Sequence, residues 1–93
     1  MQTASARHIL VNTEEACLEL KKRIEAGEAF ADIAREHSRC PSGRSGGDLG
    51  KFRKGQMVPE FDEVVFSGDL NVVHGPVRTQ FGFHLLEITE RSE

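Results

Sequence analysis

Residues 46–61 read Gly46-Gly-Asp-Leu-Gly-Lys-Phe-Arg-Lys-Gly-Gln-Met-Val-Pro-Glu-Phe61 and say more about the fold than any other part of the chain. The pattern predicts a glycine-rich strand, a tight turn and a helix that opens at Pro59, because proline is tolerated in the first helical turn, where its missing N–H would have no partner. Met57 and Phe61 lie four residues apart across the helix start, so they can project together as one apolar wall. A thioether beside a phenyl ring suits a compact apolar ligand.

The segment before this stretch begins with a predicted strand and helix. Residues 5–11 alternate between polar and apolar side chains, as a half-buried strand does. Asn12 is expected to cap the first helix, with Glu15 three residues later completing a capping box, and Gly27 is a natural stop. Cys17 falls on the apolar stripe of this helix, so we expect it to be a small buried side chain.

A second helix is predicted from Phe30, Ile33, Ala34 and His37, which recur at i, i+3, i+4 and i+7. His37 closes this stripe near the helix end, where a positively polarised imidazole is stabilised by the helix dipole. We therefore favour a structural interpretation of His37 over a catalytic one. Residues 41–47 are rich in proline, serine and glycine, and this composition predicts a loop.

The rest of the chain completes an α+β fold. The predicted elements are a strand at 48–54, a helix at 59–66, a loop at 67–73 and two strands at 75–80 and 83–89, joined near Gly82. The order β-α-α-β-α-β-β, with its closing hairpin, favours a four-stranded, mainly antiparallel sheet surrounded by helices. We expect residues 1–93 to form a single domain, because 93 residues allow one modest core.

Composition and charge argue against several classes of function. No run approaches the ~20 apolar residues that span a membrane, and the N-terminal residues lack the apolar segment of a secretory signal. The net charge of −3 opposes nucleic-acid binding, which usually requires a concentrated basic face. We therefore expect no nucleic-acid or membrane partner. The small cluster Lys51, Arg53 and Lys54 is interpreted first as a solvated strand and turn, with guidance of a peptide along a site as the alternative.

Cysteine usage favours a reducing compartment. Cys17 and Cys40 are too few for a disulfide scaffold and lack Cys-x-x-Cys spacing. Two unpaired thiols suit the cytoplasm, so we expect a cytoplasmic protein. We also expect a monomer.

The stretch at 46–61 resembles the signature of parvulin-type peptidyl-prolyl isomerases, which read Gly-Gly-Asp-Leu-Gly and then Gly-Gln-Met with a Phe four residues on. Three further segments resemble the family's motifs in the same order, namely Ala6-Arg7-His8-Ile9-Leu10, Ser38-Arg39-Cys40-Pro41-Ser42-Gly43 and Gly75-Pro76-Val77-Arg78-Thr79-Gln80-Phe81-Gly82-Phe83-His84. The resemblance covers about residues 5–90 and is greatest to the small, free-standing bacterial-type parvulins. It implies a parvulin/FKBP-like fold, isomerisation of X–Pro bonds in proline-containing peptides and unfolded chains, and no cofactor.

The resemblance also implies the site residues. His8 and His84 would form a pair at the centre of the site, with the Thr79 hydroxyl anchoring them. Cys40 would lie near the substrate carbonyl, and no metal ligand is implied. The residues expected to form the proline-binding pocket are Leu49, Met57, Phe61, Gln80 and Phe81.

Spacing alone gives these residues simpler interpretations. Met57 and Phe61 at helical spacing would more often be core, and two histidines in separate strands would be satisfied independently. Each histidine alternates with aliphatic residues, so His8 and His84 are both expected to point toward a covered face. If the two rings are neighbours, at least one is expected to be neutral at pH 7, because two adjacent positive charges are costly.

Cys40 leaves other chemistries open. A cysteine with histidines elsewhere in the chain can be the nucleophile of a thiol hydrolase, but no convincing orienting Asn or Asp accompanies it. A zinc site made by His8, Cys40 and His84 is less favoured, because zinc ligands usually come in closely spaced pairs. Since members of the family carry either Cys or Asp at this position, we favour an electrostatic role for Cys40 over covalent catalysis.

The implied reaction needs only a modest lowering of a high barrier. An X–Pro bond rotates over about 18–20 kcal/mol, and ~10–100 turnovers per second require lowering this by roughly 4–6 kcal/mol. An apolar clamp and a low-dielectric pocket would favour the twisted amide over its planar ground states. The alternative is a peptide-binding or holdase module that uses the same groove without turnover. Phosphate recognition is not expected, because residues 11–15 form an acidic loop where phosphate-directed parvulins carry Lys and Arg.

Overall fold

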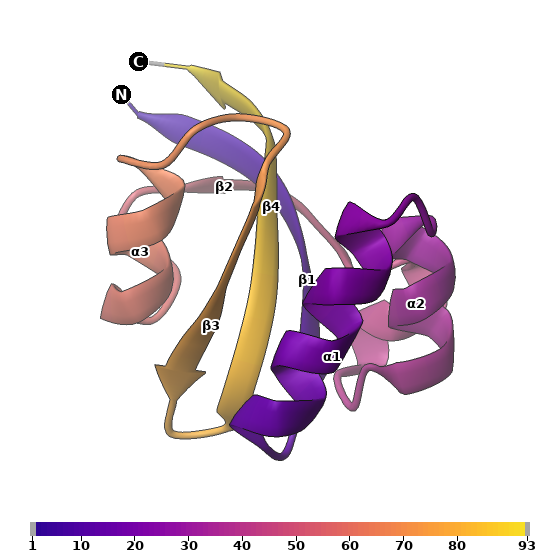
Figure 1. Cartoon of the computed structure of the whole chain (residues 1–93). Helices are drawn as coiled ribbons and strands as arrows, with labels where there is room; N and C mark the ends of the chain where they lie inside the picture. The colour runs from indigo at the N-terminus through magenta and orange to yellow at the C-terminus, as the bar shows by residue number, and fades with distance from the viewer. Residues whose placement is uncertain (1, 93) are drawn as a thin grey trace.

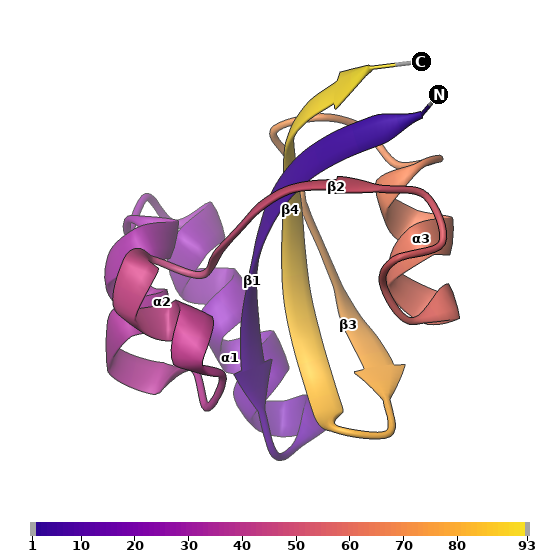
Figure 2. The ribbon, with the colours of Figure 1, turned by 180° about the vertical axis from the view of Figure 1, so that it is seen from behind.

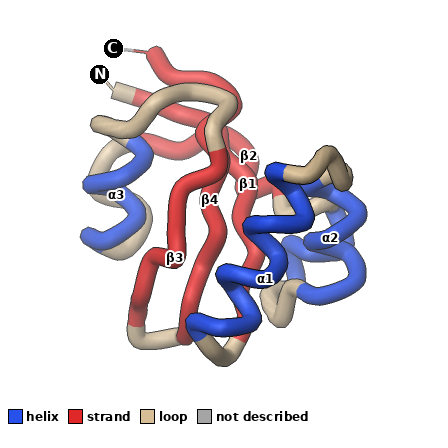
Figure 3. Tube along the Cα trace, viewed as in Figure 1, coloured by secondary structure: helices blue, strands red, loops and turns tan. Residues whose placement is uncertain are grey.

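The computed structural model describes residues 2–92, which form four strands, three α-helices and one 3-10 helix (Figures 1 and 3). In chain order the elements are β1 (Thr3–Val11), α1 (Glu14–Glu25), α2 (Phe30–His37), the 3-10 helix η1 (Pro41–Ser45), β2 (Asp48–Arg53), α3 (Pro59–Val65), β3 (Val73–Thr79) and β4 (Gly82–Ser92). None of the helices in residues 2–92 has the length and apolar character needed to cross a membrane.

The four strands form one antiparallel sheet in the order β2-β1-β4-β3, so the first and last strands of the chain lie side by side at its centre (Figures 1 and 2). The pairing of β1 with β4 begins at Thr3 opposite Ser92 and brings Leu10 opposite His84. The predicted α+β fold with a four-stranded, mainly antiparallel sheet is confirmed.

One face of the sheet is sealed by α1 and α2, which lie on the opposite side from α3 (Figures 1 and 2). Ile9 and Val11 of β1 and Leu85 of β4 point to this side. The two helices supply Cys17, Leu20, Phe30, Ile33 and Ala34 to the same cluster. The predicted burial of Cys17 is confirmed, and this burial raises the pKa of its thiol to about 11.

The opposite face of the sheet packs on α3. Its cluster consists of Ala4, Ala6, Phe52, Phe61, Val65, Leu86 and Ile88. Because side chains alternate along a strand, the same face continues two residues beyond Ala6 to His8, and two residues before Leu86 to His84. This face therefore changes along the strands from aliphatic packing to a pair of imidazoles.

The start of α1 differs from the prediction. Thr13, not Asn12, is the N-cap: its backbone is extended, and its Oγ1 accepts a hydrogen bond from the Ala16 N–H at 3.1 Å. Asn12 instead accepts a hydrogen bond from the Arg39 side chain. Glu15 consequently lies one position too early to close a capping box, so that prediction was wrong.

Residues 41–45 form a 3-10 helix, where composition predicted only a loop. Pro41 opens it, and Gly46, with a φ of 70°, ends it. The N–H groups of Gly43 and Gly46 donate to the carbonyls three residues earlier, at 2.9 and 3.0 Å. Proline, serine and glycine disfavour a long helix but permit this short one, which needs only i→i+3 bonds.

Three strands also extend beyond their predicted limits, and the first of them, β1, begins at Thr3. β3 begins at Val73, and β4 runs to Ser92. The added residues gain ladder hydrogen bonds from their neighbours in the sheet, which local alternation does not reveal. The basic cluster Lys51, Arg53 and Lys54 is exposed along β2 and the following turn, as a solvated strand would be.

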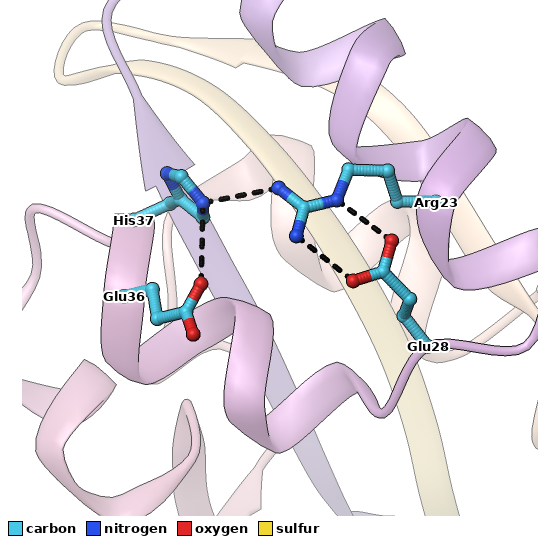
Figure 4. A network of polar contacts seen from close by, with 4 residues as sticks. All are labelled: Arg23, Glu28, Glu36 and His37. Atoms are coloured by element: carbon cyan, nitrogen blue, oxygen red, sulfur yellow. Dashed lines mark hydrogen bonds and ion pairs between the residues drawn. The ribbon is translucent and has the colours of Figure 1, made fainter.

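A polar network joins α1 to the end of α2 at the surface (Figure 4). Arg23 donates two hydrogen bonds to the Glu28 carboxylate, at 2.7 and 2.8 Å, and its third nitrogen lies 3.2 Å from Nε2 of His37. A Glu36 oxygen lies 3.6 Å from the same ring nitrogen. His37 thus ends α2, as predicted, and contributes to helix packing rather than to the pocket described next.

Candidate active site

A pocket of about 370 Å³ opens on the α3 face of the sheet, beside the segment that leads into the 3-10 helix. This volume falls within the ~300–1,000 Å³ typical of ligand pockets. The lining is almost entirely apolar and consists of His8, Leu10, Arg39, Cys40, Pro41, Leu49, Met57, Val58, Phe61, Phe81 and His84.

His8 and His84 meet at the inner wall of this pocket. Because β1 and β4 are neighbours and both side chains point to the α3 face, the rings stack with their centroids 5.4 Å apart and their planes inclined by 16°. The two Nδ1 atoms lie 3.2 Å apart, which is within hydrogen-bond distance. His8 is 5% exposed and His84 is 3% exposed. The prediction that each histidine points toward a covered face is confirmed.

Burial keeps both imidazoles neutral. Loss of hydration, together with the charge that His84 would carry, lowers the pKa of His8 from 6.5 to about 4. Burial also lowers the pKa of His84 to about 4. Both rings are therefore neutral at pH 7, where sequence reasoning required only one to be. A neutral imidazole has one N–H donor and one acceptor nitrogen, so the two rings can share a hydrogen bond.

Phe61 of α3 packs edge-on against both rings. Its ring centroid lies 4.6 Å from that of His84 and 5.5 Å from that of His8, with interplanar angles of 89° and 76°. Such T-shaped contacts match the charge distribution of aromatic rings. Phe61 also belongs to the α3-face cluster and is 4% exposed. It is thus a core residue and a pocket residue at once.

Each histidine has a hydroxyl group at its outer nitrogen. His84 Nε2 lies 2.7 Å from Thr79 Oγ1, which also accepts the backbone N–H of Phe81 at 3.1 Å. His8 Nε2 lies 3.0 Å from Ser42 Oγ, a contact that sequence reasoning missed. We call the four linked side chains Ser42, His8, His84 and Thr79 the hydroxyl–histidine row.

Close backbone contacts hold Ser42 against His8. The His8 N–H donates to the Gly47 carbonyl at 2.9 Å, and the Gly47 N–H donates to the Ser42 carbonyl at 2.8 Å. Gly47 has a φ of 86°, and a Cβ there would lie 2.3 Å from the His8 carbonyl oxygen. Only glycine permits this close approach, which explains why the stretch at 46–61 has a glycine at its second position.

Cys40 reaches the pocket because its segment is tied to β1. The Arg39 N–H donates to the Leu10 carbonyl at 2.8 Å, and the Leu10 N–H donates to Ser38 Oγ at 3.1 Å. The Cys40 thiol is free and half-buried at the pocket wall. Within residues 2–92, no group of three or more His, Cys, Asp or Glu side chains is arranged to hold a metal ion.

Of the other residues predicted to form the pocket, three line it and one does not. Leu49, Met57 and Phe81 line the pocket, with Phe81 61% exposed at its rim. Gln80 does not line it but borders a smaller hollow together with Glu60. Its role in substrate binding therefore stays a prediction. The pocket residues that sequence reasoning missed are Leu10, Arg39, Pro41 and Val58, each next to or near a predicted one in the chain.

A larger hollow of about 570 Å³ adjoins the pocket and shares Arg39, Cys40 and Pro41 with it. Its lining also includes Arg35 and Arg44, so it is strongly basic. It contains neither histidine. Of the two, the smaller pocket is the better candidate for the active site, because it combines apolar walls with the buried imidazole pair.

A match to a family model agrees with this geometry. Residues 5–90 match the family described as "Rotamase: PPIC-type PPIASE domain". The chain therefore belongs to the parvulin, or PPIC-type, family of peptidyl-prolyl isomerase domains.

Known relatives show the same family at the level of sequence and structure. The chain is 45% identical over 89 residues to the foldase protein PrsA of Halalkalibacterium halodurans, a match that covers 95% of this chain and 27% of PrsA. It superposes on the crystal structure of PrsA from Bacillus anthracis with a TM-score of 0.95 and 32% identity, covering 99% of this chain and 43% of that one. On NmPin, the parvulin of Nitrosopumilus maritimus, the TM-score is 0.86 at 30% identity, covering 97% and 98%. The chain spans only 27–32% of the length of three PrsA relatives, from Halalkalibacterium halodurans and two Geobacillus strains.

Proposed function

We propose that this chain is a peptidyl-prolyl cis–trans isomerase that accelerates rotation about X–Pro bonds in unfolded or flexible chains. The observation that carries the proposal is an apolar pocket whose inner wall is a stacked pair of neutral histidines. Membership of the PPIC-type family and similarity to the foldase PrsA support it. No cofactor takes part in the proposed reaction.

The pocket favours the transition state through its low polarity. Met57, Phe61 and Phe81 offer apolar surface to the proline ring. A planar amide is strongly dipolar, because resonance moves charge from nitrogen to oxygen, whereas the twisted amide has lost this resonance. A dry pocket therefore destabilises the planar forms relative to the twisted one. Lowering the barrier by roughly 4–6 kcal/mol gives turnover on the scale of ~10–100 per second.

The histidines act in this mechanism by their neutrality and fixed geometry. With pKa values of about 4, His8 and His84 are rarely protonated at pH 7, so neither is a good general acid there. Cys40 contributes a polarisable group at the pocket wall, near the altered carbonyl. The mechanism is a non-covalent twist, and no bond to Cys40 forms.

A peptide-binding module without turnover is the second candidate. Some relatives are named for chaperone activity, including the chaperone SurA of Methylobacillus flagellatus and the SurA-like chaperones of Campylobacter jejuni. The match to a rotamase family over residues 5–90 favours the isomerase. Unfolded, proline-containing chains are the proposed partners in either case, and the chain is proposed to act as a monomer.

A cytoplasmic location is proposed from the two free thiols of Cys17 and Cys40. One of the two SurA-like chaperones of Campylobacter jejuni, Cj1289, is described as periplasmic, and a relative from Arabidopsis thaliana is described as chloroplastic. Fractionation of the source cells, followed by immunoblotting for this chain, tests the proposal. Recovery with periplasmic or secreted proteins would contradict it.

An exchange measurement on unphosphorylated X–Pro tetrapeptides tests the proposed function. The folded chain should raise the cis–trans exchange rate above the buffer control in the absence of metal, nucleotide or partner. An exchange rate equal to buffer, with folding verified by circular dichroism, would leave the binding module. Line broadening of the peptide without faster isomerisation would support that alternative directly.

Phosphorylated peptides test the proposal that the enzyme has no preference for phosphoserine-Pro or phosphothreonine-Pro substrates. Glu14 and Glu15 begin α1 after the first strand and oppose a phosphoserine, whose charge is near −2. We expect phosphoserine-Pro and serine-Pro peptides to have kcat/KM values within about threefold, or ~0.6 kcal/mol. A tenfold gain on phosphorylation would contradict this and would point to the basic hollow lined by Arg35, Arg39 and Arg44.

A further inference from the structure

Ser42 is the member of the hydroxyl–histidine row that comes from outside the sheet. It lies in the 3-10 helix, whereas His8, His84 and Thr79 belong to β1, β4 and β3. We propose that Ser42 is a positioning residue of the site: its hydroxyl accepts the hydrogen of His8 Nε2, closes the row and so fixes the tautomers of both histidines. The hydrogen-bond order does not depend on the proposed function, but its effect on catalysis rests on it.

The Thr79 hydroxyl sets the direction of the row. Thr79 is 8% exposed, and its Oγ1 already accepts the Phe81 N–H at 3.1 Å. Its own hydrogen needs an acceptor, and within residues 2–92 the structure offers His84 Nε2, at 2.7 Å, and no other. Because a hydroxyl has one hydrogen to donate, the Thr79 O–H donates to His84 Nε2.

This first bond determines the next two. A neutral imidazole that accepts at Nε2 carries its hydrogen on Nδ1. His84 Nδ1–H therefore donates to His8 Nδ1 at 3.2 Å, and His8 must carry its hydrogen on Nε2. His8 Nε2–H then donates to Ser42 Oγ at 3.0 Å. The order requires both rings to be neutral: a second proton on His8, at Nδ1, would place two N–H groups face to face between the rings, and a second proton on His84, at Nε2, would meet the Thr79 hydrogen.

The opposite direction leaves a buried hydrogen without a partner. If His8 Nδ1–H donated to His84, Thr79 Oγ1 would receive two N–H groups, and its own hydrogen would have no acceptor among the described residues. An unpaired buried donor is strongly disfavoured. Removal of the Ser42 hydroxyl creates the same defect at the other end, on His8 Nε2. With Ser42 present, one direction of hydrogen bonding gives every hydrogen in the row an acceptor, from Thr79 at one end to His8 at the other.

The backbone around Ser42 holds this hydroxyl in place before any substrate arrives. Gly47 links the two ends of the contact, since it accepts from the His8 N–H and donates to the Ser42 carbonyl. Ser42 and His8 are thus joined by a backbone path and a side-chain path. Such double attachment limits rotation of the imidazole at the pocket wall.

Imidazole nitrogen spectra test the proposal on the intact chain. Two-bond hydrogen–nitrogen correlation spectra of the ¹⁵N-labelled protein at pH 7 distinguish protonated from bare ring nitrogens. We expect His84 to be protonated on Nδ1 and His8 on Nε2. Protonation of His8 on Nδ1, or rapid averaging of both tautomers in the wild-type chain, would overturn the proposed order.

Three substitutions separate positioning from general structure. Ser42→Ala should mix the His8 tautomers and lower kcat/KM by about tenfold, or ~1.4 kcal/mol. Ser42→Thr keeps a hydroxyl and should restore the wild-type spectrum and most of the activity. Ser45→Ala, in the exposed part of the same helix, is the matched control and should change neither.

The outcomes are separable. Wild-type tautomers in a folded Ser42→Ala variant would overturn the positioning role, whatever the activity. If Ser42→Ala does not fold, the proposal is tested by the wild-type spectrum and by the Ser42→Thr variant. Loss of the Nε2-protonated form of His8 in Ser42→Thr would then count against the proposal. If Ser42→Ala alters the tautomers while the wild-type chain shows no isomerisation, the proposed function fails and the role of Ser42 in the row stands.

Discussion

The two faces of the sheet are built from the same two central strands but are completed differently. On one face, β1 and β4 present Ile9, Val11 and Leu85 to α1 and α2, and the space is filled. On the other, the same strands present Ala4, Ala6 and then His8 to the shorter α3, and a pocket remains. Neighbouring residues of β1 therefore have different roles: Ile9 packs in the sealed core, and His8 faces the pocket.

The difference between the two faces shows how a small domain can have both a stable core and a binding pocket. The sealed face contributes buried apolar area, with the Arg7–Glu87 ion pair beside it. The α3 face uses residues such as Phe61 in both ways, since Phe61 packs in the core and contacts both histidines. Substitutions on the sealed face should therefore lower stability and leave activity unchanged, whereas substitutions in the pocket should mainly lower activity.

The largest expected effect is loss of stability from the sealed face. Ile33 of α2 is 2% exposed, so Ile33→Ala should lower the free energy of unfolding by about 2–5 kcal/mol through lost burial and a cavity. Urea denaturation measures this change. The kcat/KM per folded molecule should be unchanged, and a fall in it of tenfold or more would mean that the faces are not independent.

Acid should destabilise the protein through the imidazole pair. His8 has a folded pKa of about 4 against 6.5 for an ordinary histidine, so between these values the unfolded chain binds a proton that the folded chain does not. Stability contributed by the neutral ring is thus present above pH 6.5 and lost as pH falls toward 4. At about 1.4 kcal/mol per pKa unit, His8 alone accounts for a loss of up to about 3 kcal/mol.

Urea denaturation at several pH values between 4 and 7 tests this dependence. In a His8→Gln variant, which has no ring to titrate, the fall in stability over this range should be smaller. A slope equal to that of the wild-type chain would show that His8 titrates normally in the fold. His84, whose pKa burial also lowers, is expected to act in the same direction.

A moderate effect on activity is expected from the α3 face. Met57 is half-buried in the pocket wall, so Met57→Ala should lower kcat/KM by about tenfold while costing less stability than a core substitution. Phe61→Ala is a poorer test, because Phe61 is also core. Leu18→Ala, on the exposed side of α1, is the control and should leave activity unchanged. Equal activity of Met57→Ala and wild type would remove Met57 from the site.

The smallest effect is expected from replacing the Cys40 thiol by a carboxylate. Cys40→Asp should keep kcat/KM within about threefold of wild type, whereas Cys40→Ala should lose more, because aspartate retains a polar group at the pocket wall. The same peptide serves for both variants, with mass spectrometry of the wild-type chain during turnover. Inactivity of both variants, together with a trapped covalent adduct, would make Cys40 a nucleophile and exclude the twist mechanism.

Local patterns made most of the fold and part of the site predictable. Apolar periodicity and turn residues placed seven of the strands and helices, and the motifs placed His8, His84, Cys40 and Met57 together. The cap of α1 was missed because Asn12 and Thr13 are both good caps, and the contact of Asn12 with Arg39 is not local. The 3-10 helix was missed because its residues have the composition of a loop.

The sequence by itself determined the order of elements, the α+β class and the family, because these depend on side-chain periodicity and motifs within short windows. Only the tertiary structure decided that Ser42 meets His8, 34 residues away, and that His8 and His84, 76 residues apart, face each other through their Nδ1 atoms. These contacts depend on sheet register and on the close approach that Gly47 allows. The neutrality of both histidines was likewise a tertiary property, because a pKa responds to burial, and burial is set by the whole fold.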